Sequence, residues 1–510
     1  MKKIVFYLAL GISVLGHSQE VTPNDALRYS IEDLNGSARF RGMSGAFGAL
    51  GGDLSALSIN PAGTTVFTYN TFEGSLANYY NRNNSTYFGG KGSSNNNSLD
   101  INQIGVALVF NNTSKNSDWS KMTLALNYEK TNNYDNQLFM QGTNPSNSIG
   151  NYFLNYAQGY NLEYLQTLPG ESINSLYTYL GETNGLGFGA QQAMLGYQGY
   201  IFNADDDTNP SNTTYNTNIA PGSFYQDNYV NTQGFNSKAT ANFAGVYKEI
   251  LSLGMNLNIH FSDFTKSSSV LERNNNPEYT TGETVKLIQF DNELYSYGRG
   301  FSMNFGAILK ASDMFRIGLA YESPTWHTIS DELTQNLKTV TTDGTNNFTN
   351  TINPQVTNVY KSHGVTSPGK WTASTAVVFG KKGLISFDIA SKNHSNTKFR
   401  RENEDLNPYF KNNLQNAISY NLGGEYRIKQ ISLRAGYRYE QSPYKVDYIM
   451  GDLTGYSGGI GYSYNESRID FALSKANRNY NTQLISSGMN DAARIRNNNT
   501  NITMSYTVSF

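Results

Sequence analysis

Charged side chains recur along one face of the segment 431–440. Arg434, Arg438 and Glu440 alternate there with apolar and aromatic residues. Side chains of a β-strand point alternately to opposite faces, so these three charges share a face. Two kinds of chemistry fit the pattern. The charges can form a network with neighbouring elements, or the Arg434 guanidinium can bind the carboxylate head group of a ligand, because its planar fork of donors matches a carboxylate.

Other residues capable of chemistry lack the partners that a catalytic or metal site needs. His260 shares a face with Asn256 and Asn258, but the chain has only five His and no Cys. The three Asp at 205–207 lack the ligand spacing of a calcium loop. No Ser, His and carboxylate stand at a recognisable spacing, so an esterase or lipase is the weakest option. We expect no catalytic residues, no cofactor and no metal, with His260 solvated and 205–207 at a loop tip.

The elements that must position these residues are β-strands, and the sharpest strand pattern lies at the C-terminus. There the residues Ile502, Met504, Tyr506, Val508 and Phe510 fall on one face, and Thr or Ser occupies the positions between them. A strand with an apolar face and a hydroxyl-bearing face fits the wall of a barrel in lipid. The same alternation recurs at 122–129, 253–262, 301–309 and 431–440.

Counting such segments gives about fourteen strands, an even number as expected for an up-and-down barrel. They lie near 65–80, 101–110, 119–130, 236–248, 251–266, 292–310, 314–328, 368–380, 383–395, 412–427, 431–442, 452–464, 467–480 and 498–510. Short turns alternate with long polar connections along the chain, as tight periplasmic turns and large outer loops would. We therefore predict an all-β transmembrane barrel, with an extracellular insertion at about 131–235 that forms short helices over the mouth.

The N-terminus predicts export. Lys2 and Lys3 precede an apolar run at 4–15, which is too short to span a bilayer and indicates a signal peptide over 1–18. The chain has a net charge of −2 and no basic patch, so nothing suggests nucleic acid. Its 37 Tyr suit a membrane interface, where a ring meets both hydrocarbon and head groups. These observations favour the outer membrane of a Gram-negative bacterium.

Residues 19–63 do not alternate. Asn24 and Asp25 are expected to cap a short helix through Leu34. The run GSARFRGMSGAFGALGGDLSALSINPAG, at 36–63, is rich in Gly and Ala, which permit close backbone packing. This run resembles the N-terminal hatch of the FadL/OmpP1/TodX family of outer-membrane transport proteins, which has a Gly/Ala-rich stretch, an acidic-Xaa-Ser-Ala segment and an Asn-Pro-Ala-Gly sequence. The segment 433–439 and the terminal Phe510 are also similar to later strands of that family.

The resemblance implies a fourteen-stranded barrel, 64–510, whose lumen is plugged by a hatch with short helices, 19–63. By the same match Asn60, Pro61, Ala62 and Gly63 would lie where the hatch meets the wall, and with Asp53 they are the candidate hatch and gating residues.

The resemblance also implies a function. Small hydrophobic compounds such as long-chain fatty acids would be captured outside and released by hatch movement and lateral diffusion. The candidate ligand-binding residues are Phe40, Phe47 and Arg434. The expected partners are the hydrophobic ligand, outer-membrane lipid, and the barrel-assembly machinery through the C-terminal strand ending at Phe510. The alternative is a FadL-like interaction or shuttle protein for surface secretion machinery. Transport predicts a continuous apolar cavity near the hatch, whereas a lumen that is polar throughout, with an intact periplasmic hatch, favours the alternative.

Overall fold

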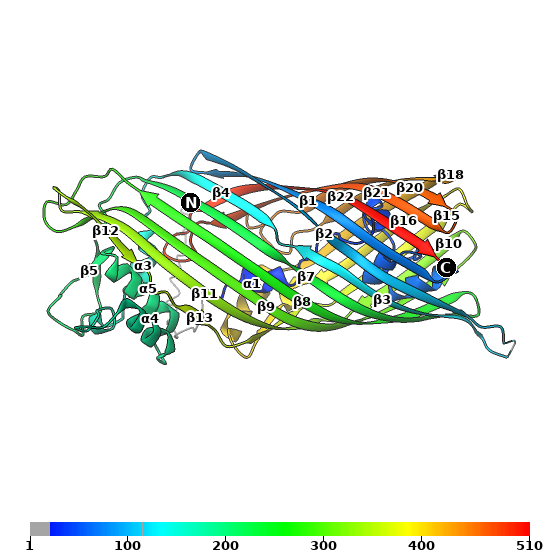
Figure 1. The fold of residues 1–510 in the computed structure, drawn as a ribbon, viewed down its shortest axis with the longest axis horizontal. Coiled ribbons are helices and arrows are strands. Elements are labelled where there is room, and N and C mark those ends of the chain that lie inside the picture. The colour runs from blue at the N-terminus through cyan, green and yellow to red at the C-terminus, as the bar shows by residue number, and fades with distance from the viewer. Residues whose placement is uncertain (1–20, 115) are drawn as a thin grey trace, which may run out of the picture.

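A single antiparallel sheet closes on itself in the computed structural model, which describes residues 21–114 and 116–510. β1 (Thr71–Tyr87) pairs with both β2 (Gly90–Asn111) and the last strand, β22 (Ala492–Ser509), and this pairing closes the barrel (Figure 1). Fourteen strands cross the wall when a strand and its continuation are counted as one, which confirms the expected all-β barrel. The expected signal peptide lies outside the described residues.

The remaining strands follow one another around the wall in sequence order. They are β3 (Trp119–Asn133) continued by β4 (Asn136–Asn144), β7 (Phe224–Tyr247), β8 (Leu251–Arg273), β9 (Thr284–Lys310), β10 (Phe315–Glu322) continued by β11 (Thr325–Thr342), β14 (His363–Ser367) continued by β15 (Lys370–Val378), β16 (Gly383–Asn393), β18 (Asn416–Ile428), β19 (Ile431–Glu440), β20 (Leu453–Tyr464) and β21 (Ser467–Gln483). Two of the interrupted strands break at Pro324 and Pro368, because proline has no backbone donor for the ladder.

The strands turn their apolar face outward. In β22 the exposed fraction is 56% for Ile502 and 44% for Met504, whereas Thr503 and Ser505 are buried at 0% and 1%. The same orientation holds in β8, where Ile259 is exposed and Asn258 is buried. An outward apolar belt with polar residues inside is the arrangement of a barrel that stands in lipid.

Short turns and long connections alternate as expected, but the strands are longer than the apolar pattern indicates. The C-terminus lies at the end with the short turns (Figure 1). At the other end β8 and β9 continue far beyond their apolar residues, so the loop expected at 267–291 shrinks to 274–283. The region 81–100, which lacks apolar alternation, belongs to a long hairpin of β1 and β2. Backbone hydrogen bonds continue the ladder past the membrane, where no apolar face is needed.

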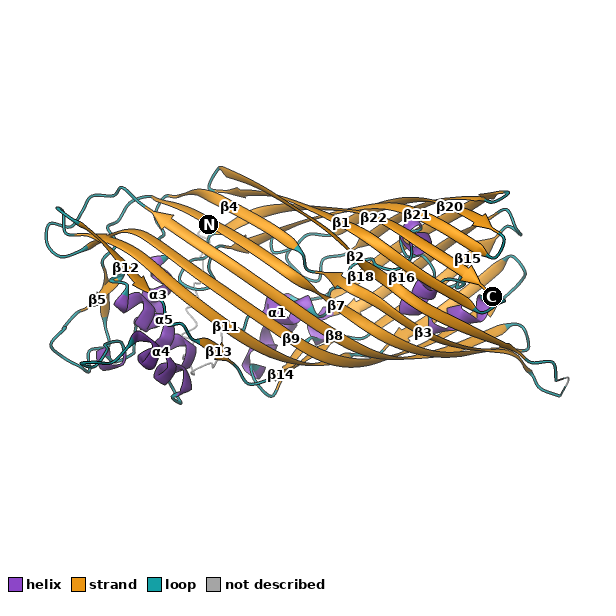
Figure 2. Ribbon diagram, in the orientation of Figure 1, coloured by secondary structure: helices purple, strands orange, loops and turns teal. Residues whose placement is uncertain are grey.

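Residues 21–67, here called the plug segment, lie inside the barrel (Figure 2). Most of their side chains between 35 and 65 are buried. The segment contains the helices α1 (Pro23–Arg28) and α2 (Ala38–Gly42) and the 3-10 helices η1 (Leu54–Ser58) and η2 (Pro61–Val66). α2 contacts β19 to β22 on one side of the wall, and η2 contacts β3 and β7 to β9 on the other. The plug segment therefore spans the lumen from wall to wall.

The first helix of the plug segment ends earlier than expected. α1 stops at Arg28 instead of continuing to Leu34, and its N-cap is Thr22, whose backbone N donates to Asp25 Oδ2 at 2.9 Å. Beyond the helix, Asp33 N donates to Thr131 O of β3 at 3.0 Å. The backbone N–H groups at 29–31 still bond back to Ala26 and Leu27, but Asp33 bonds to the wall, so the helix does not continue to Leu34. Among the described residues, no helix combines the length and the hydropathy needed to cross a membrane.

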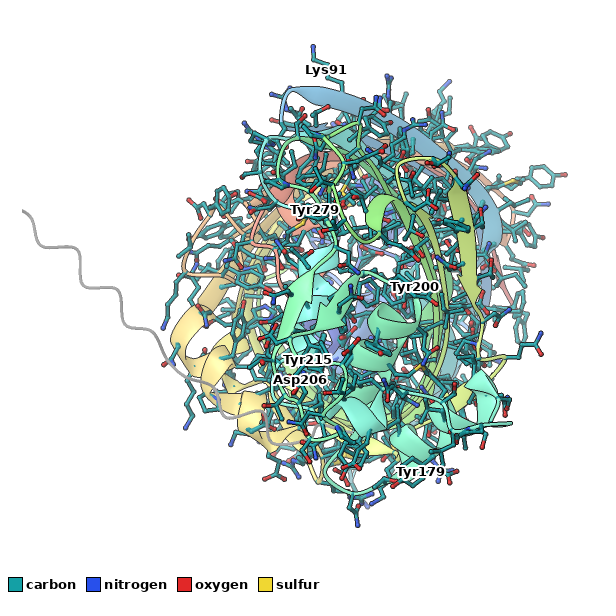
Figure 3. The ribbon with its side chains drawn as sticks, turned by 90° about the vertical axis from the view of Figure 1, so that its left-hand side faces the viewer. Lys91, Tyr179, Tyr200, Asp206, Tyr215 and Tyr279 are labelled. Carbon is teal, nitrogen blue, oxygen red and sulfur yellow. The ribbon has the colours of Figure 1, made fainter. Side chains whose placement is uncertain are left out.

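A helical insertion covers the mouth at the long-loop end. The connection expected at 131–235 narrows to 145–223, because β4 and the start of β7 extend the wall. It contains α3 (Gly150–Ala157), η3 (Leu162–Tyr164), α4 (Ile173–Glu182), α5 (Gly187–Gln198) and a hairpin of β5 (Phe202–Ala204) and β6 (Tyr215–Thr217). Figure 3 views this end and shows Tyr179, Tyr200 and Tyr215 of the insertion across the opening. Its apolar side chains pack on wall residues such as Val270 and Phe290, so the insertion is anchored.

Smaller elements complete the long-loop end. They are β12 (Asn347–Ile352), β13 (Thr357–Val359), η4 (His394–Asn396), β17 (Lys398–Arg400), η5 (Glu404–Leu406) and α6 (Asn407–Asn413). Phe399 and Phe410 from this group pack with Leu27 and Tyr29 of the plug segment in one apolar cluster. The start of the plug segment is thereby fixed in the middle of the barrel.

Candidate functional site

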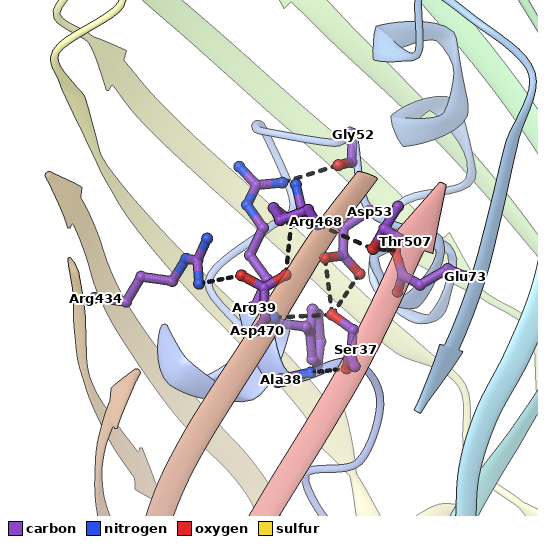
Figure 4. A network of polar contacts seen from close by, with 12 residues as sticks. Ser37, Ala38, Arg39, Gly52, Asp53, Glu73, Arg434, Arg468, Asp470 and Thr507 are labelled. Atoms are coloured by element: carbon purple, nitrogen blue, oxygen red, sulfur yellow. Dashed lines mark hydrogen bonds and ion pairs between the residues drawn. The ribbon is translucent and has the colours of Figure 1, made fainter. Parts of the chain in front are cut away.

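A buried ion network joins the plug segment to the wall (Figure 4). Glu425 Oε2 of β18 accepts from Arg39 Nε of α2 at 3.0 Å and from Arg434 Nε of β19 at 2.7 Å. Arg434 Nη1 also binds Asp470 Oδ1 of β21 at 2.7 Å. All four side chains are nearly inaccessible to solvent. The network interpretation of the charges at 431–440 is confirmed, and protein carboxylates engage the Arg434 guanidinium.

Arg438 and Glu440 form a second pair farther toward the mouth. Arg438 Nε donates to Glu440 Oε1 at 2.6 Å, and Arg478 Nη2 of β21 lies 3.3 Å from Glu440 Oε2. The three charges of β19 are thus divided between two networks. One of them includes the plug segment and the other lines the lumen above it.

Asp53 organises the plug segment from within. Its carboxylate accepts from Ser37 Oγ at 2.9 and 2.8 Å and from Ser55 N at 3.0 Å, where it caps η1. Next to it, Ala38 N donates to Ser505 Oγ of β22 at 2.6 Å. A single buried carboxylate therefore ties the starts of α2 and η1 together at the point where they contact the wall.

The Asn-Pro-Ala-Gly sequence lies at the opposite junction with the wall. Asn60 Nδ2 donates to Gly48 O at 2.8 Å and to Ala307 O of β9 at 3.0 Å. Pro61 O accepts from Asn242 Nδ2 of β7 at 2.9 Å. Ala62 packs so closely on β8 that a Cβ added at Gly254 would stand 2.5 Å from Ala62 N. Gly63 completes the turn, and its carbonyl accepts from Gly52 N at 3.0 Å.

The two phenylalanines of the plug segment pack on each other. Phe40 and Phe47 lie with ring centroids 5.3 Å apart, and both are buried. Their cluster includes Met43 and Leu50 of the plug segment and Leu384 of the wall. Backbone N–H groups at 47 and 48 donate to Asp388 Oδ2 at 2.9 and 3.0 Å. In this arrangement the rings hold the plug segment together.

The cavity beside the plug segment has a mixed lining. A volume of about 150 Å³ lies against 30–34 and is lined by apolar residues such as Ile31 and Ala390 together with charged ones such as Lys392 and Arg438. A second cavity of similar size adjoins it at Asp33 and Arg438. Neither of these two cavities is the continuous apolar cavity expected near the hatch. Inward side chains of the wall supply the charge together with Glu32 and Asp33 of the plug segment.

The other candidates for chemistry have ordinary partners. His260 is buried rather than solvated, because Nε2 lies 2.8 Å from Ser302 Oγ and the ring packs on His327. Asp206 stands in an exposed loop, where Thr208 donates to its carboxylate and lowers its pKa. The described part of the chain contains no cluster of His and acidic residues that could hold a metal ion.

One feature of the wall was not anticipated from the sequence, namely a break in the ladder beside the plug segment. β2 pairs with β3 only from Gln103 to Asn111, and β4 pairs with β7 alone. Side chains close the break instead: Lys130 of β3 pairs with Asp100 of β2, and Asn133 Nδ2 donates to Ser98 Oγ at 3.2 Å. The outward residues Leu99 and Ile101 beside it are 71% and 51% exposed, so the break begins at the edge of the apolar belt.

The plug segment runs along this break. Asn132 Nδ2 donates to Ile31 O at 2.9 Å, and Tyr79 OH donates to Asn35 Oδ1 at 3.0 Å. Asn102 of β2 also donates to Gly36 O. Neighbours of the residues that close the wall are thus held by hydrogen bonds to 31–36, so a movement of this part of the plug segment removes support from the break.

A closed barrel with an apolar belt and an internal plug defines an outer-membrane transport barrel. The model of the family described as outer membrane protein transport protein (OMPP1/FadL/TodX) matches residues 210–510, and the chain belongs to this family. It is a family of transport proteins of the Gram-negative outer membrane, not of enzymes. Its members carry hydrophobic compounds.

Solved structures show the same fold at low sequence identity. A Pseudomonas aeruginosa FadL homologue is similar with a TM-score of 0.54 and 12% identity, over 94% of this chain and 100% of that chain. The Pseudomonas putida toluene transporter TodX is similar with a TM-score of 0.50 and 14% identity, over 94% of this chain and 99% of that chain. No curated protein matches the chain in sequence.

Proposed function

We propose that this barrel takes up small hydrophobic compounds such as long-chain fatty acids passively across the outer membrane. The ligand is captured on the outside, and it leaves by movement of the plug segment and lateral diffusion through the wall. The observation that carries this proposal is the break between β2 and β3–β4 beside residues 31–36. A ligand held above the plug segment has a short path through this break into the apolar belt, where hydrophobic compounds partition favourably.

A fatty acid suits the lining of the lumen better than an uncharged hydrocarbon does. Lys392 faces the same cavity as Ile31 and Ala390, and no described carboxylate forms an ion pair with it, whereas Arg438 is paired with Glu440. The cavity is also lined by acidic residues, namely Glu32, Asp33, Asp388 and Glu440. An apolar chain buries area there at roughly 25 cal/mol per Å², while a carboxylate head group finds a cationic partner. Phe40 and Phe47 would act on the ligand indirectly, through the shape of the plug segment.

The gating residues follow from the same proposal. Asp53 and the sequence Asn60 to Gly63 hold the plug segment at its two junctions with the wall. The proposed division is a signal peptide at 1–18, a hatch at 19–63 and a barrel at 64–510 with an insertion near 131–235. In the precursor, the C-terminal strand ending at Phe510 is the segment that the barrel-assembly machinery would bind, and outer-membrane lipid surrounds the finished wall.

The test is to close the break chemically. Ser98→Cys with Asn133→Cys places two thiols where the native side chains are in contact, in a chain without cysteine. A short bis-methanethiosulfonate, which forms a disulfide with each thiol and releases sulfinate, should then abolish most uptake of radiolabelled oleate by cells. A reductant that cleaves these disulfides should restore uptake. The matched control is Ser391→Cys with Asn416→Cys, which joins side chains 2.8 Å apart on strands that already share a full ladder. Unchanged uptake after complete cross-linking of the first pair contradicts a lateral route.

The charged lining also supports a second candidate, an interaction or shuttle protein for surface secretion machinery. A helical insertion anchored over the mouth offers such a protein a docking surface. The two candidates differ in what a deletion strain loses. Loss of oleate uptake, with an unchanged set of surface proteins, supports transport. Loss of surface proteins with normal oleate uptake supports the shuttle.

A further inference from the structure

The underside of the plug segment, at the short-turn end, contains a pocket of about 300 Å³ that the transport route does not use. Four arginines line it, and none of its described lining residues is acidic: they are Arg39, Arg316, Arg427 and Arg468. The short-turn end faces the periplasm in barrels of this type. The pocket is therefore a cationic recess that opens toward the periplasm.

The carboxylates near these arginines, which include the buried Asp53 and Glu73 of the same network (Figure 4), do not line the recess. Glu425 binds three guanidinium groups, those of Arg39, Arg427 and Arg434, and Asp470 binds those of Arg434 and Arg468. Both carboxylates are fully buried, whereas the Arg427 side chain is 41% exposed. The shared negative charge thus lies behind the arginines, and the accessible side of the recess is positive.

Arg316 has side-chain N–H donors that are available to a ligand. Its Nη1 donates to Leu50 O at 3.0 Å, and no described carboxylate forms an ion pair with it. It is only partly exposed. A guanidinium has five N–H donors, so most of those on Arg316 remain available to a ligand. Half-buried cations without a partner are costly to a fold, and an anion in the recess would offset that cost.

The opposite wall of the recess is apolar. Leu50, Val66 and Phe67 of the plug segment and Val378 and Leu384 of the barrel line it. A volume of this size holds a small molecule, whereas a stable protein partner needs an interface of at least about 1,000 Å². The two faces together match a molecule with one anionic head and a short apolar tail.

We propose that this recess binds an amphipathic carboxylate from the periplasmic side. The carboxylate would lie between Arg316 and Arg427, with the tail against Leu384 and Val66. Arg316 and Arg39 also hold the loop at 50–52, because Arg39 Nη1 donates to Gly52 O at 2.8 Å (Figure 4). A bound carboxylate competes with these carbonyl acceptors, so occupancy loosens the loop. The site lies on the far side of the plug segment from the lumen cavities. It is therefore a proposal independent of the lateral route.

Binding of octanoate to the full-length protein in a non-ionic detergent tests the proposal by calorimetry. Arg316→Gln and Arg427→Gln should each weaken octanoate binding by about tenfold, because each removes a charge-assisted donor pair. Arg316→Lys should retain most of the affinity. Arg82→Gln, on the exposed outer side of β1, is the matched control and should leave it unchanged. Octanol, which has no charge, and inorganic phosphate, which has no tail, should both bind more weakly than octanoate.

Several outcomes overturn the site. If octanol binds as tightly as octanoate, the site does not require an anion. If phosphate binds as tightly as octanoate, the site does not require an apolar tail. Octanoate binding that survives both glutamine variants but is lost in Lys392→Gln assigns it to the lumen, which overturns this site and leaves the proposed function intact. Hydrogen exchange gives a second measurement on the same samples: octanoate should speed exchange of the amides near 50–52 in the parent and not in Arg316→Gln. Heat-modified gel mobility confirms that each variant is folded.

Discussion

Gly306 of β9 lies against the amide of Asn60: a Cβ added at Gly306 would stand 2.0 Å from Asn60 Oδ1. Asn60 needs this position to donate from Nδ2 to Ala307 O, the carbonyl of the next residue on the strand. The wall therefore has a glycine where the plug segment is attached. Gly254 on the neighbouring strand has the same function toward Pro61 and Ala62.

Gly306→Val is expected to displace Asn60 and loosen the plug segment at this junction. The added side chain overlaps the amide, and the two hydrogen bonds of Asn60 Nδ2 are lost. Leakage of a bulky antibiotic or a chromogenic substrate into cells should rise several-fold. Gly74→Val on β1 is the control, since a Cβ there meets only the ring of Phe72, at 3.9 Å. Equal leakage in both variants would show that the junction does not control access.

Glu425→Gln is expected to destabilise the attachment of the plug segment on the other side. It removes the negative charge that Arg39, Arg427 and Arg434 share. Removing one partner of a buried ion pair costs about 3–5 kcal/mol. Urea unfolding in lipid vesicles, followed by tryptophan fluorescence, should show this loss, and trypsin should cleave the plug segment sooner. Glu466→Gln, in an exposed turn, should behave as the parent does. A stability equal to that of the parent would mean that water replaces the carboxylate at no cost.

The sequence predicts the barrel because the membrane imposes a local rule. Every wall residue that faces lipid must be apolar, so Ile502, Met504 and Tyr506 reveal their strand without any knowledge of its neighbours. The charge network of Arg434 was predictable for a similar reason, since an arginine on the inward face of a strand requires partners. Its partner Asp470 stands between outward Ile469 and Phe471, and that inward acidic position is a signal of the same kind.

The features that depend on distant contacts were not predictable. The break arises because β3 and its continuation β4 keep pairing with β7 but stop pairing with β2. No sequence pattern within 130–144 indicates this. The strands at 81–100 lack apolar alternation because they stand outside the belt. The mixed, charged lining of the cavities beside the plug segment was not predicted, because inward positions carry no constraint from lipid. Contacts such as Ala38 with Ser505 join the two ends of the chain and follow only from closure of the barrel.

The docking of the insertion is expected to depend on pH through Glu272. This residue lies well beyond Phe261, the last exposed apolar residue of β8, and is 2% exposed beneath α3. Its carboxyl accepts from Ile149 N at 2.8 Å and Gln226 Nε2 at 2.7 Å, and burial raises its pKa from 4.5 to about 7. A raised carboxyl pKa gives stability that is present below the unfolded value and is lost as the pH rises through about 7.

Limited proteolysis of 145–223 should therefore be faster at pH 8.5 than at pH 5.5. The upper limit of the effect is about 3 kcal/mol, from 1.36 kcal/mol per unit of pKa. Glu272→Gln keeps the hydrogen bonds without the charge and should remove the pH dependence. Glu293→Gln on β9, where the carboxylate is exposed, should retain it. A parent protein with the same cleavage rate at both pH values would contradict the role of Glu272.

Phe510 is expected to matter for assembly and not for the finished barrel. Its backbone N donates to Asn70 O at 2.9 Å, which fixes the end of the chain beside β1, but its ring is 64% exposed. Phe510→Ala removes little buried area, so the unfolding free energy should change by no more than about 0.5 kcal/mol. If the terminal aromatic is what the assembly machinery binds, the amount of heat-modifiable barrel in the outer membrane should nevertheless fall several-fold, with unfolded precursor accumulating in the periplasm.

Phe305→Ala, another exposed ring on the outer wall, separates a general loss of aromatic surface from a loss of this terminal signal. Equal assembly of the two variants would place the recognition elsewhere in the strand.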